Sequence, residues 1–539
     1  MEPEFYTFEH NDIKWTAASK YSRIMESRVL RRIEQLPSLE KCRLVKRNMY
    51  RTTYMYKPVH PAAAGVYIKR YQIRNWRERF LTKLRQSQAY REWKMMIVMR
   101  QKGFPVPAPV ALGERWNKKT IENYLVSLEI LGAVPFREAG GVDAEKEKLL
   151  AALASLANGF RKENIFYKDF QLGNMLLKKR GINSELFVVD LHSARLLTSL
   201  SKGQISYMLA KLIDSFAPTF DSRDQDTFLK FYAEGDPRFT TNLKQKLKAV
   251  KSVATRIRQT HLKSRTKRCL VKSTGFSVGN CEGLRLFHRK EVDRRAILNA
   301  FRAYKEAAEK GGKPVKSTKK TDLSIVETPE GKVCVKHYRN VNMLDRIKGG
   351  LGKSRARRAW VIGNGLVVRN IPTSKPLALL EGADEAFLLS TALVDMPRID
   401  YYILEHFKEP VEGPKLKRKD DFIRSFAGAI RSLHDKNTYH GDLKACNILV
   451  EELPDGGWEF YFIDYDKVVF DQKVSLRRRI KNLAQLHTSI PWCITWADRM
   501  RFFKAYAGDE TYARSKAAFL REVMRESNKR IPVAMHPLE

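Results

Sequence analysis

The chain has 539 residues, of which 100 are Lys or Arg and 60 are Asp or Glu, giving a formal net charge of +40. This length suffices for at least two domains with complete cores, and the charge indicates an anionic partner, such as a membrane surface, a phosphorylated lipid or a nucleic acid. No apolar run approaches the roughly 20 residues that a spanning helix needs, and we expect no secretory signal. The six cysteines show neither a C-x-x-C pair nor zinc spacing, which is typical of reduced thiols in the cytosol.

The N-terminal half opens with a strand-rich segment, residues 44–69, whose last run alternates in polarity and ends in Lys69. Such alternation predicts a strand with one buried face. A lysine at this point can reach the α- and β-phosphates of a nucleotide, and Glu92, on the helix expected next, is placed to orient Lys69 by an ion pair. A later amphipathic helix is predicted by apolar residues at helical spacing, namely Leu149, Leu153, Leu156 and Phe160.

That helix leads into a loop in which Asp169 stands five residues before Asn174. A short apolar strand, 175–177, follows, and the apolar run 187–189 then ends in Asp190. This is the layout of a phosphotransferase site, in which one carboxylate lies near the attacking hydroxyl group while an amide and a second carboxylate hold Mg²⁺. The pattern predicts Asp169 as the catalytic carboxylate and Asn174 and Asp190 as metal ligands, with ATP and Mg²⁺ as cofactors.

The C-terminal half repeats these elements at offsets of 267 to 274 residues. Its lysine strand ends at Lys336, and the helix before its Asp loop is marked by Phe422, Phe426, Ile430 and Leu433. The predicted site residues that follow are Asp442 and Lys444 for catalysis and Asn447 and Asp464 for the metal. Lys444 is placed to neutralise the transferring phosphoryl group. The repetition indicates tandem copies of one α+β fold, residues 1–262 and 263–539, with the seam in the basic helical stretch 243–268.

The two copies differ at supporting positions. The second copy has His440 where the first has Tyr167, and Lys444 where the first has Gln171. It also has Ala359 at the position of Glu92, and the flanking acids, Asp345 and Glu381, are out of register, so we expect Lys336 to lack an orienting carboxylate. Neither copy has G-x-G-x-x-G before its lysine strand, which predicts a phosphate-covering hairpin of another composition. The segment 311–320 is expected to be a polar loop within the second copy.

At these residues the chain resembles the bacterial lipopolysaccharide core kinases, the heptose and Kdo kinases. The first copy is similar to heptose kinases in Glu92–Trp93, in the Phe-Pro-Val-Pro turn at 104–107 and in Val-Asp-Leu-His-Ser-Ala-Arg at 189–195. The second is similar to Kdo kinases in His-Gly-Asp-Leu-Lys at 440–444 and Ile-Asp-Tyr-Asp at 463–466.

The resemblance implies two tandem protein-kinase-like bilobal domains, each with a strand-rich N-lobe and a helical C-lobe. It also implies an ATP- and Mg²⁺-dependent kinase that phosphorylates an inner-core sugar. The partner would be the lipopolysaccharide core or a lipid A-core precursor, at the cytoplasmic face of the inner membrane. A tandem arrangement departs from the single-domain members and leaves open whether both copies are active.

Basic residues gather between the lysine strand and the next helix in both copies. In the first copy they run from Arg70 to Arg91 around an apolar stripe of Trp76, Phe80 and Leu84, and in the second from Arg339 to Arg358. A solvated charged face is one interpretation, and a helix seated on an anionic membrane surface is the other. We favour the membrane surface because the pattern occurs twice. No nucleic acid is expected, since no zinc-finger, RNP or OB signature accompanies the charge.

Two alternatives stay open. An atypical Ser/Thr protein kinase would also suit the His-Gly-Asp-Leu-Lys loop at 440–444, although neither copy has an Ala-Pro-Glu segment. A pseudokinase serving as a binding scaffold is the other alternative for one copy, because Ala359 and Tyr167 replace residues of the usual set.

Overall fold

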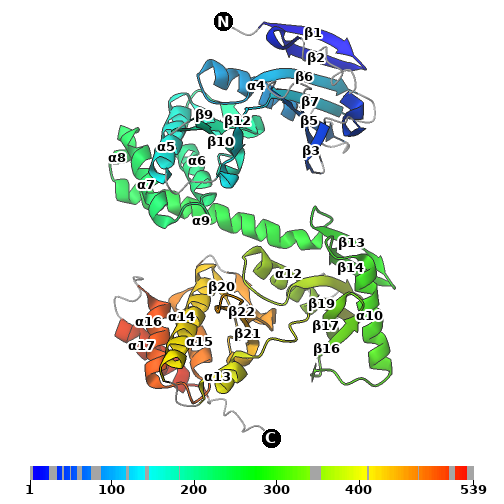
Figure 1. Ribbon diagram of the computed structural model, residues 1–539, viewed down its shortest axis with the longest axis vertical. Coiled ribbons are helices and arrows are strands. Elements are labelled where there is room, and N and C mark those ends of the chain that lie inside the picture. The colour runs from blue at the N-terminus through cyan, green and yellow to red at the C-terminus, as the bar shows by residue number, and fades with distance from the viewer. Residues whose placement is uncertain are drawn as a thin grey trace. The chain divides into compact units, whose positions relative to one another are not determined.

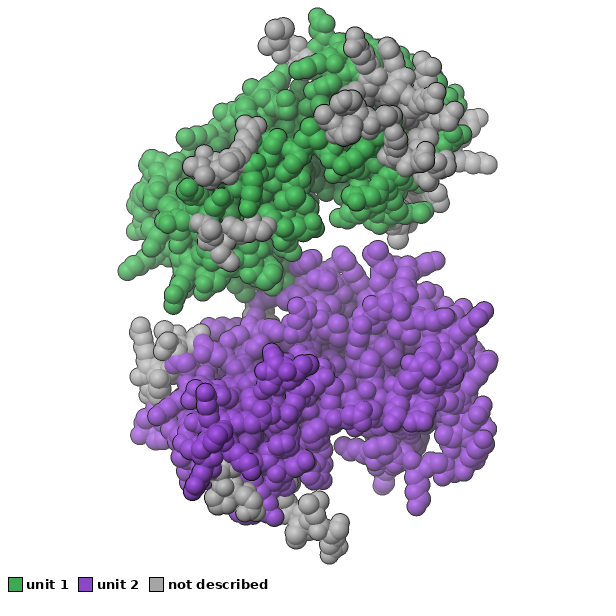
Figure 2. All heavy atoms as spheres, in the orientation of Figure 1, with its two compact units in different colours: residues 1–258 green, residues 259–539 purple. Residues whose placement is uncertain are grey.

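The computed structural model describes all residues except 1–3, 23–32, 39–41, 49, 58–63, 74–85, 117–120, 140–144, 181–182, 340–353, 409–411, 471–472, 509–515 and 531–539. The chain forms two compact units, residues 1–258 (unit 1) and 259–539 (unit 2), coloured separately in Figure 2. Within each unit a sheet comes first in the chain and helices follow (Figure 1). Among the described helices, none is both long and apolar enough to cross a membrane.

The sheet of unit 1 is antiparallel with the strand order β1-β2-β6-β7-β5-β4-β3. Its strands are β1 (Phe5–His10), β2 (Ile13–Ala18), β3 (Cys42–Arg47), β4 (Arg51–Tyr56), β5 (Val66–Ile73), β6 (Pro109–Trp116) and β7 (Ile121–Leu128). Lys69 lies on β5, paired with Thr53 of β4 and Leu125 of β7, so the predicted lysine strand is central.

The rest of unit 1 is mainly helical. Its longer helices are α4 (Gln88–Gln101), α5 (Lys146–Lys162), α6 (Lys202–Asp214), α7 (Ser222–Glu234) and α9 (Leu243–Lys267), the last of which leads into unit 2, and the short helix α8 (Pro237–Thr240) precedes α9. Short strands lie in the segments between these helices, namely β8 (Ala133–Pro135), β9 (Ile165–Tyr167), β10 (Met175–Arg180), β11 (Asn183–Val188) and β12 (Ala194–Leu196).

Unit 2 repeats this plan. Its sheet has the order β13-β14-β18-β19-β17-β16-β15, and Lys336 of β17 lies between Leu323 of β16 and Leu388 of β19. The sheet strands are β13 (Phe276–Cys281), β14 (Leu284–Arg289), β15 (Lys316–Ser317), β16 (Thr321–Thr328), β17 (Gly331–Arg339), β18 (Pro376–Glu381) and β19 (Glu385–Thr391). The helices are α10 (Arg294–Glu309), α12 (Arg355–Val368), α13 (Ile399–Phe407), α14 (Pro414–Asp435), α15 (Leu476–His487), α16 (Trp496–Ala507) and α17 (Lys516–Asn528). The short strands are β20 (Thr438–Tyr439), β21 (Ile448–Glu452), β22 (Trp458–Phe462) and β23 (Val469–Phe470).

Helices α5 and α14 carry the two apolar stripes that the sequence predicts. Leu149, Leu153 and Phe160 are almost fully buried in the core of unit 1, and Phe422 and Ile430 in that of unit 2. Burial of each such side chain stabilises a fold by about 1.5–3 kcal/mol. Since each helix ends directly before an Asp loop, this packing fixes the start of that loop.

The helix that follows the lysine strand is capped in the same way in both units. Ser87 accepts a hydrogen bond from the N–H of Tyr90 at the start of α4, and Ser354 does so from Arg357 at the start of α12. Each serine also donates to a glutamate of the neighbouring strand, at 3.2 Å to Glu114 and 2.5 Å to Glu381. Glu381 therefore belongs to the cap of its helix, which explains why it is out of register with Glu92.

Hairpins precede both lysine strands, as the absence of a glycine-rich motif led us to expect. They are β3–β4 in unit 1 and β15–β16 in unit 2. The segment 311–320 is accordingly not all loop, because Lys316 and Ser317 pair with Leu323 and Asp322 as the edge strand β15.

Candidate active site

Glu92 is the centre of a closed set of contacts around the lysine of unit 1. The Lys69 Nζ atom lies 2.6 Å from Glu92 Oε1, the ion pair that the sequence predicts. The Tyr71 hydroxyl group donates to Glu92 Oε2 at 2.8 Å, and the Leu191 N–H donates to Oε1 at 3.2 Å. Glu92 is 2% exposed, so these three donors hold one buried carboxylate in one orientation.

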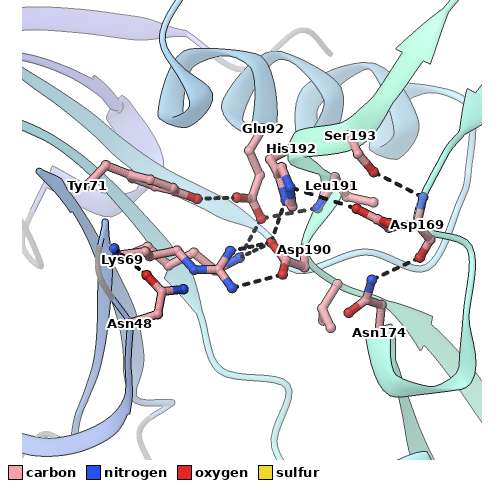
Figure 3. A network of polar contacts seen from close by, with 12 residues as sticks. Asn48, Lys69, Tyr71, Glu92, Asp169, Asn174, Asp190, Leu191, His192 and Ser193 are labelled. Atoms are coloured by element: carbon pink, nitrogen blue, oxygen red, sulfur yellow. Dashed lines mark hydrogen bonds and ion pairs between the residues drawn. The ribbon is translucent and has the colours of Figure 1, made fainter. Parts of the chain in front are cut away.

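Asp190 has left-handed backbone geometry, with φ 64°, at the start of the short helix η5 (Leu191–Ser193). Its Oδ1 atom lies 2.9 Å from His192 Nδ1, 3.5 Å from Lys69 Nζ and 2.6 Å from Arg51 Nη1 (Figure 3). Burial alone would raise the pKa of Asp190, but His192, Lys69 and Arg51 outweigh it and hold that pKa well below the usual range. Asp190 is therefore ionised and is held in place by the basic side chains around it.

Asp464 of unit 2 has the same backbone geometry, with φ 53°, at the start of η8 (Tyr465–Lys467). A non-glycine residue with positive φ is uncommon, and such strain gathers at functional sites. The left-handed geometry recurs at both predicted metal aspartates, so it is a property of the repeated fold.

The same internal hydrogen bond closes each of the two Asp loops. The Asn174 amide donates to the carbonyl oxygen of Asp169 at 2.9 Å, and the Asn447 amide donates to that of Asp442 at 2.9 Å. The Asp169 carboxylate itself is 38% exposed, and its ion-pair contact is His192 Nε2 at 3.9 Å. It remains open to an incoming hydroxyl group.

Tyr167 and His440 perform one structural task with different chemistry. The Tyr167 hydroxyl group donates to the Val189 carbonyl oxygen at 2.8 Å, and His440 Nε2 lies 3.2 Å from the Ile463 carbonyl oxygen. Burial raises the pKa of Tyr167 and lowers that of His440, so both side chains stay neutral and can donate. Each links its Asp loop to the strand end before the metal aspartate.

In unit 2 two lysines contact the predicted catalytic carboxylate. Lys444 Nζ lies 3.3 Å from Asp442 Oδ1, and Lys467 Nζ lies 3.4 Å from Asp442 Oδ2. Lys444 was predicted to neutralise the transferring phosphoryl group, whereas Lys467 had no predicted role. The equivalent positions in unit 1 are Gln171 and Ser193, so the two sites differ in charge around the same aspartate.

The prediction that Lys336 lacks an orienting carboxylate is wrong. Lys336 Nζ lies 3.0 Å from Asp466 Oδ2 and 3.1 Å from Asp464 Oδ1, and the Tyr338 hydroxyl group donates to Asp466 Oδ1 at 3.2 Å. Asp466 thus takes the lysine and tyrosine contacts that Glu92 takes in unit 1. It comes from the turn after the metal aspartate instead of from the helix, where Ala359 is fully buried. Asp345 lies outside the described residues.

Other contacts that position the loops were not found from the sequence. Ser215 and Ser489, at equivalent places after α6 and α15, accept hydrogen bonds of 2.9 Å from the N–H groups of Leu172 and Ala445. In unit 2, Asn482 also donates to the His440 carbonyl oxygen at 2.6 Å. The sequence repeat could have identified these serines, because Ser215 and Ser489 are separated by the same 274 residues that separate the helices before them.

The side chains of unit 1 include a donor set that suits a divalent cation. Ligand atoms of Glu92, Asp190 and His192 lie within 4.8 Å of one another, and carboxylate oxygens are the donors that Mg²⁺ prefers. Lys69 and Arg51 beside them supply positive charge for phosphate oxygens. The residues therefore fit a nucleotide with its metal. Of the three, Asp190 is the one predicted as a ligand.

The basic stretch that we expect to contact a membrane lies largely outside the described residues. Positions 74–85 in unit 1 and 340–353 in unit 2 are among those left out, so the apolar stripe of Trp76, Phe80 and Leu84 has no structural account. Arg70, at the edge of this stretch, pairs with Glu122 at 2.8 Å.

A sheet with a central lysine, followed by a helical part with an Asp–Asn loop and a left-handed Asp, defines a protein-kinase-like domain, and the chain contains two in tandem. The sequence model of the lipopolysaccharide kinase (Kdo/WaaP) family matches residues 40–232 and again residues 305–506. The chain belongs to this family and carries its domain twice. It is accordingly a phosphotransferase of lipopolysaccharide biosynthesis, and the resemblance and fold class expected from the sequence are confirmed.

Similar solved structures include WaaP in complex with acyl carrier protein, at 18% identity over 44% of this chain and 99% of that chain, with a TM-score of 0.32. The Rio2 kinase–ADP/Mg²⁺–phosphoaspartate complex from Chaetomium thermophilum has 15% identity over 48% of this chain and 82% of that chain, with a TM-score of 0.25. The BubR1 kinase domain has 11% identity, covers 43% and 63% of the respective chains, and has a TM-score of 0.24. No curated protein matches the chain in sequence.

Proposed function

We propose that this protein is an ATP- and Mg²⁺-dependent kinase that phosphorylates a hydroxyl group of an inner-core lipopolysaccharide sugar, either heptose or Kdo. The observation that carries the proposal is the ordered set of lysine, aspartate, asparagine and left-handed aspartate that occurs in both units. Such a set supplies what phosphoryl transfer needs, namely positive charge on the phosphates, metal ligands and a carboxylate at the attacking oxygen.

In unit 1, Lys69, held by Glu92, neutralises nucleotide phosphate oxygens, and Asn174 and Asp190 hold the Mg²⁺ ion. Bound Mg²⁺ supplies charge neutralisation at the phosphates. Asp169, whose carboxylate is 38% exposed, orients the acceptor hydroxyl group and takes its proton.

In unit 2, Lys336, Asn447 and Asp464 have the corresponding nucleotide and metal roles, and Asp442 corresponds to Asp169. Lys444 stabilises charge on the transferring phosphoryl group. We assign heptose-type transfer to the first half, residues 1–262. The second half, residues 263–539, acts on another sugar or supports acceptor binding.

The acceptor would be the lipopolysaccharide core or a lipid A-core precursor, reached from the cytoplasmic side of the inner membrane. The net charge of +40 supports peripheral contact with the anionic membrane surface. The same charge would serve a lipid-linked substrate that is itself anionic.

Phosphate transfer from ATP to purified lipopolysaccharide core tests the function. Asp169→Asn and Asp442→Asn keep the side-chain shape and remove the charge, so transfer by an active unit should fall by roughly 10²–10⁴. The matched controls are Asp226→Asn, at a partly exposed position on α7 of unit 1 outside the site, and Asp395→Asn, at an exposed position of unit 2. Unchanged transfer in both single variants and in the double variant would refute the assignment.

Mass spectrometry of lipopolysaccharide from a deletion strain identifies the acceptor. Loss of one core phosphate is the expected result. An intact core combined with transfer to a protein substrate would favour the atypical protein kinase, and absent nucleotide binding in one unit would make that unit a scaffold.

A further inference from the structure

A cavity of about 550 Å³ opens beside Asp169 in unit 1. Its size lies within the range of small-molecule sites, which is about 300–1,000 Å³. The wall includes His192 and Ser193, which contact Asp169, so the cavity adjoins the exposed catalytic carboxylate. Because the nucleotide residues Lys69 and Glu92 do not line it, this space is available to the acceptor.

Cations line the rest of the cavity. Lys168 lies directly before Asp169, Arg195 lies on β12, and Arg91 lies on α4. Lys168 and Arg195 are both exposed, and neither forms an ion pair or a side-chain hydrogen bond within the part of the chain that the structure describes. Their charges are therefore available to a ligand in the cavity.

Two aromatic rings complete the wall. Phe166 of β9 and Tyr207 of α6 have ring centroids 6.2 Å apart at 53°, and Arg195 pairs with Phe166 across the β9–β12 ladder. An aromatic pair beside positive charge suits the apolar C–H face of a sugar ring that bears an anionic group.

Two of these three cations are particular to unit 1, whereas Arg91 corresponds to Arg358 of unit 2. The positions of Lys168 and Arg195 are taken by Gly441 and Val469 in unit 2, where Val469 pairs with Tyr439 as Arg195 pairs with Phe166. The lysines of unit 2, Lys444 and Lys467, contact Asp442 itself. The two units thus present different surfaces to an acceptor.

We propose that the cavity beside Asp169 binds an acceptor sugar that already carries a carboxylate or a phosphate group, with Lys168 and Arg195 as its anion-binding residues. This inference rests on the proposed function, because it identifies the cavity as the acceptor side of a kinase site. It restricts the acceptor to an anionic saccharide in which the charged group lies close to the hydroxyl group that is phosphorylated.

Calorimetric titration of the full chain, without ATP, with heptose, a heptose phosphate and Kdo tests the proposal. The anionic probes should bind at least about 10-fold more tightly than heptose, since a charged hydrogen bond contributes more than a neutral one. A preference for Kdo would identify a carboxylate site, and a preference for the heptose phosphate would identify a phosphate site. Equal affinity for all three probes overturns the proposal.

The double variant Lys168→Gln/Arg195→Gln assigns the effect to these side chains. Affinity for the preferred anionic probe should fall by about 10-fold or more, and the acceptor KM should rise with little change in nucleotide affinity. Lys179→Gln/Lys230→Gln removes the same charge from exposed sites of unit 1 outside the cavity and should leave both constants unchanged. An unaltered affinity in the first variant would refute the assignment.

The kinase function and the anion site can be refuted separately. If the chain transfers no phosphate from ATP but binds the anionic sugar through Lys168 and Arg195, the kinase function fails and the anion site stands. If transfer occurs and the double variant retains its acceptor KM, the anion site fails and the kinase function stands.

Discussion

Arg51 and Asp190 form a two-point ion pair, with Nη1 2.6 Å from Oδ1 and Nη2 3.0 Å from Oδ2. Arg51 is the first residue of β4, so the hairpin before the lysine strand reaches the predicted metal ligand. The equivalent residue of unit 2 is Thr321, since Arg51 pairs with Tyr71 and Thr321 pairs with Tyr338 in the two sheets. In unit 1 the predicted metal aspartate is therefore paired with an arginine, whereas unit 2 has a threonine at the position of that arginine.

Arg51→Gln should strengthen binding of Mg²⁺ without nucleotide, because Arg51 occupies both oxygens of Asp190 and competes with the ion. A gain of about 10-fold corresponds to about 1.4 kcal/mol, within the range of a hydrogen bond to a charged group. The variant should also lose about 1–3 kcal/mol of unfolding free energy, since Asp190 is mostly buried. Mg²⁺ titration and denaturant unfolding measure the two effects.

Arg47→Gln is the control for this variant, because Arg47 is exposed on the same hairpin. Neither Mg²⁺ affinity nor stability should change in it. Weaker Mg²⁺ binding by Arg51→Gln would mean that the guanidinium group supports the metal site instead of competing with it.

Asp466→Asn should weaken nucleotide binding by unit 2. Asp466 receives both Lys336 and Tyr338, and an amide cannot balance the lysine charge. Burial alone would lower the pKa of Lys336, but Asp466 and Asp464 raise it, so the lysine is charged and depends on these partners. In a Lys69→Met background, which removes the contribution of unit 1, ATP affinity should fall by about 10-fold.

The matched change for Asp466→Asn is Glu412→Gln, at an exposed position near the start of α14. In the same background it should bind ATP as the parent does. Equal ATP affinity in the Asp466→Asn variant and its control would show that Lys336 is held by Asp464 alone.

Contacts that follow from local order could be predicted from the sequence. The alternation before Lys69 and the spacing of Leu149, Leu153 and Phe160 each depend on a few neighbouring residues, and both elements formed. The Asp–Asn interval set the loop geometry, because Asn174 and Asn447 bond back across five residues to the same carbonyl position.

Contacts between distant segments could not be predicted in this way. Arg51 meets Asp190 across 139 residues, and Lys336 meets Asp466 across 130, so neither pair has a periodic signal. The prediction that Lys336 lacks an orienting carboxylate was wrong because it considered only the helix position of Glu92, which Ala359 occupies in unit 2. The fold needs a carboxylate near the lysine, and unit 2 supplies it from the turn at η8.

Tyr167→Phe should destabilise unit 1 by about 1–3 kcal/mol, because the partly buried carbonyl oxygen of Val189 would lose its hydrogen-bond donor. The Asp loop would also lose its link to the strand before Asp190, so kcat should fall more than the KM for ATP rises. Denaturant unfolding and steady-state kinetics measure these effects. Tyr90→Phe, on α4, should stay within about 0.5 kcal/mol of the parent; a similar loss there would show that Tyr167 contributes through packing alone.

His434 should make the stability of unit 2 depend on pH. The side chain is fully buried, with Nδ1 2.8 Å from the Tyr506 hydroxyl group and Nε2 3.0 Å from Asn482 Oδ1, and burial lowers its pKa to about 4. The unfolded chain, in which histidine has a pKa of about 6.5, therefore binds a proton that the folded chain does not bind between these two values. Stability should be complete above pH 6.5, fall by up to about 3 kcal/mol as the pH drops to 4, and lose nothing further from this group below pH 4.

Denaturant unfolding of the parent and of His434→Gln between pH 4 and pH 7 isolates this contribution. The variant should be less stable near pH 7, since Tyr506 and Asn482 lose a matched partner, and its free energy of unfolding should fall less steeply with acid. Because Asn482 also donates to the His440 carbonyl oxygen, the same variant should loosen the Asp442 loop. His261→Gln, at an exposed position, should retain the pH profile of the parent. Parallel profiles for the parent and His434→Gln would mean that His434 is protonated equally in the folded and unfolded states.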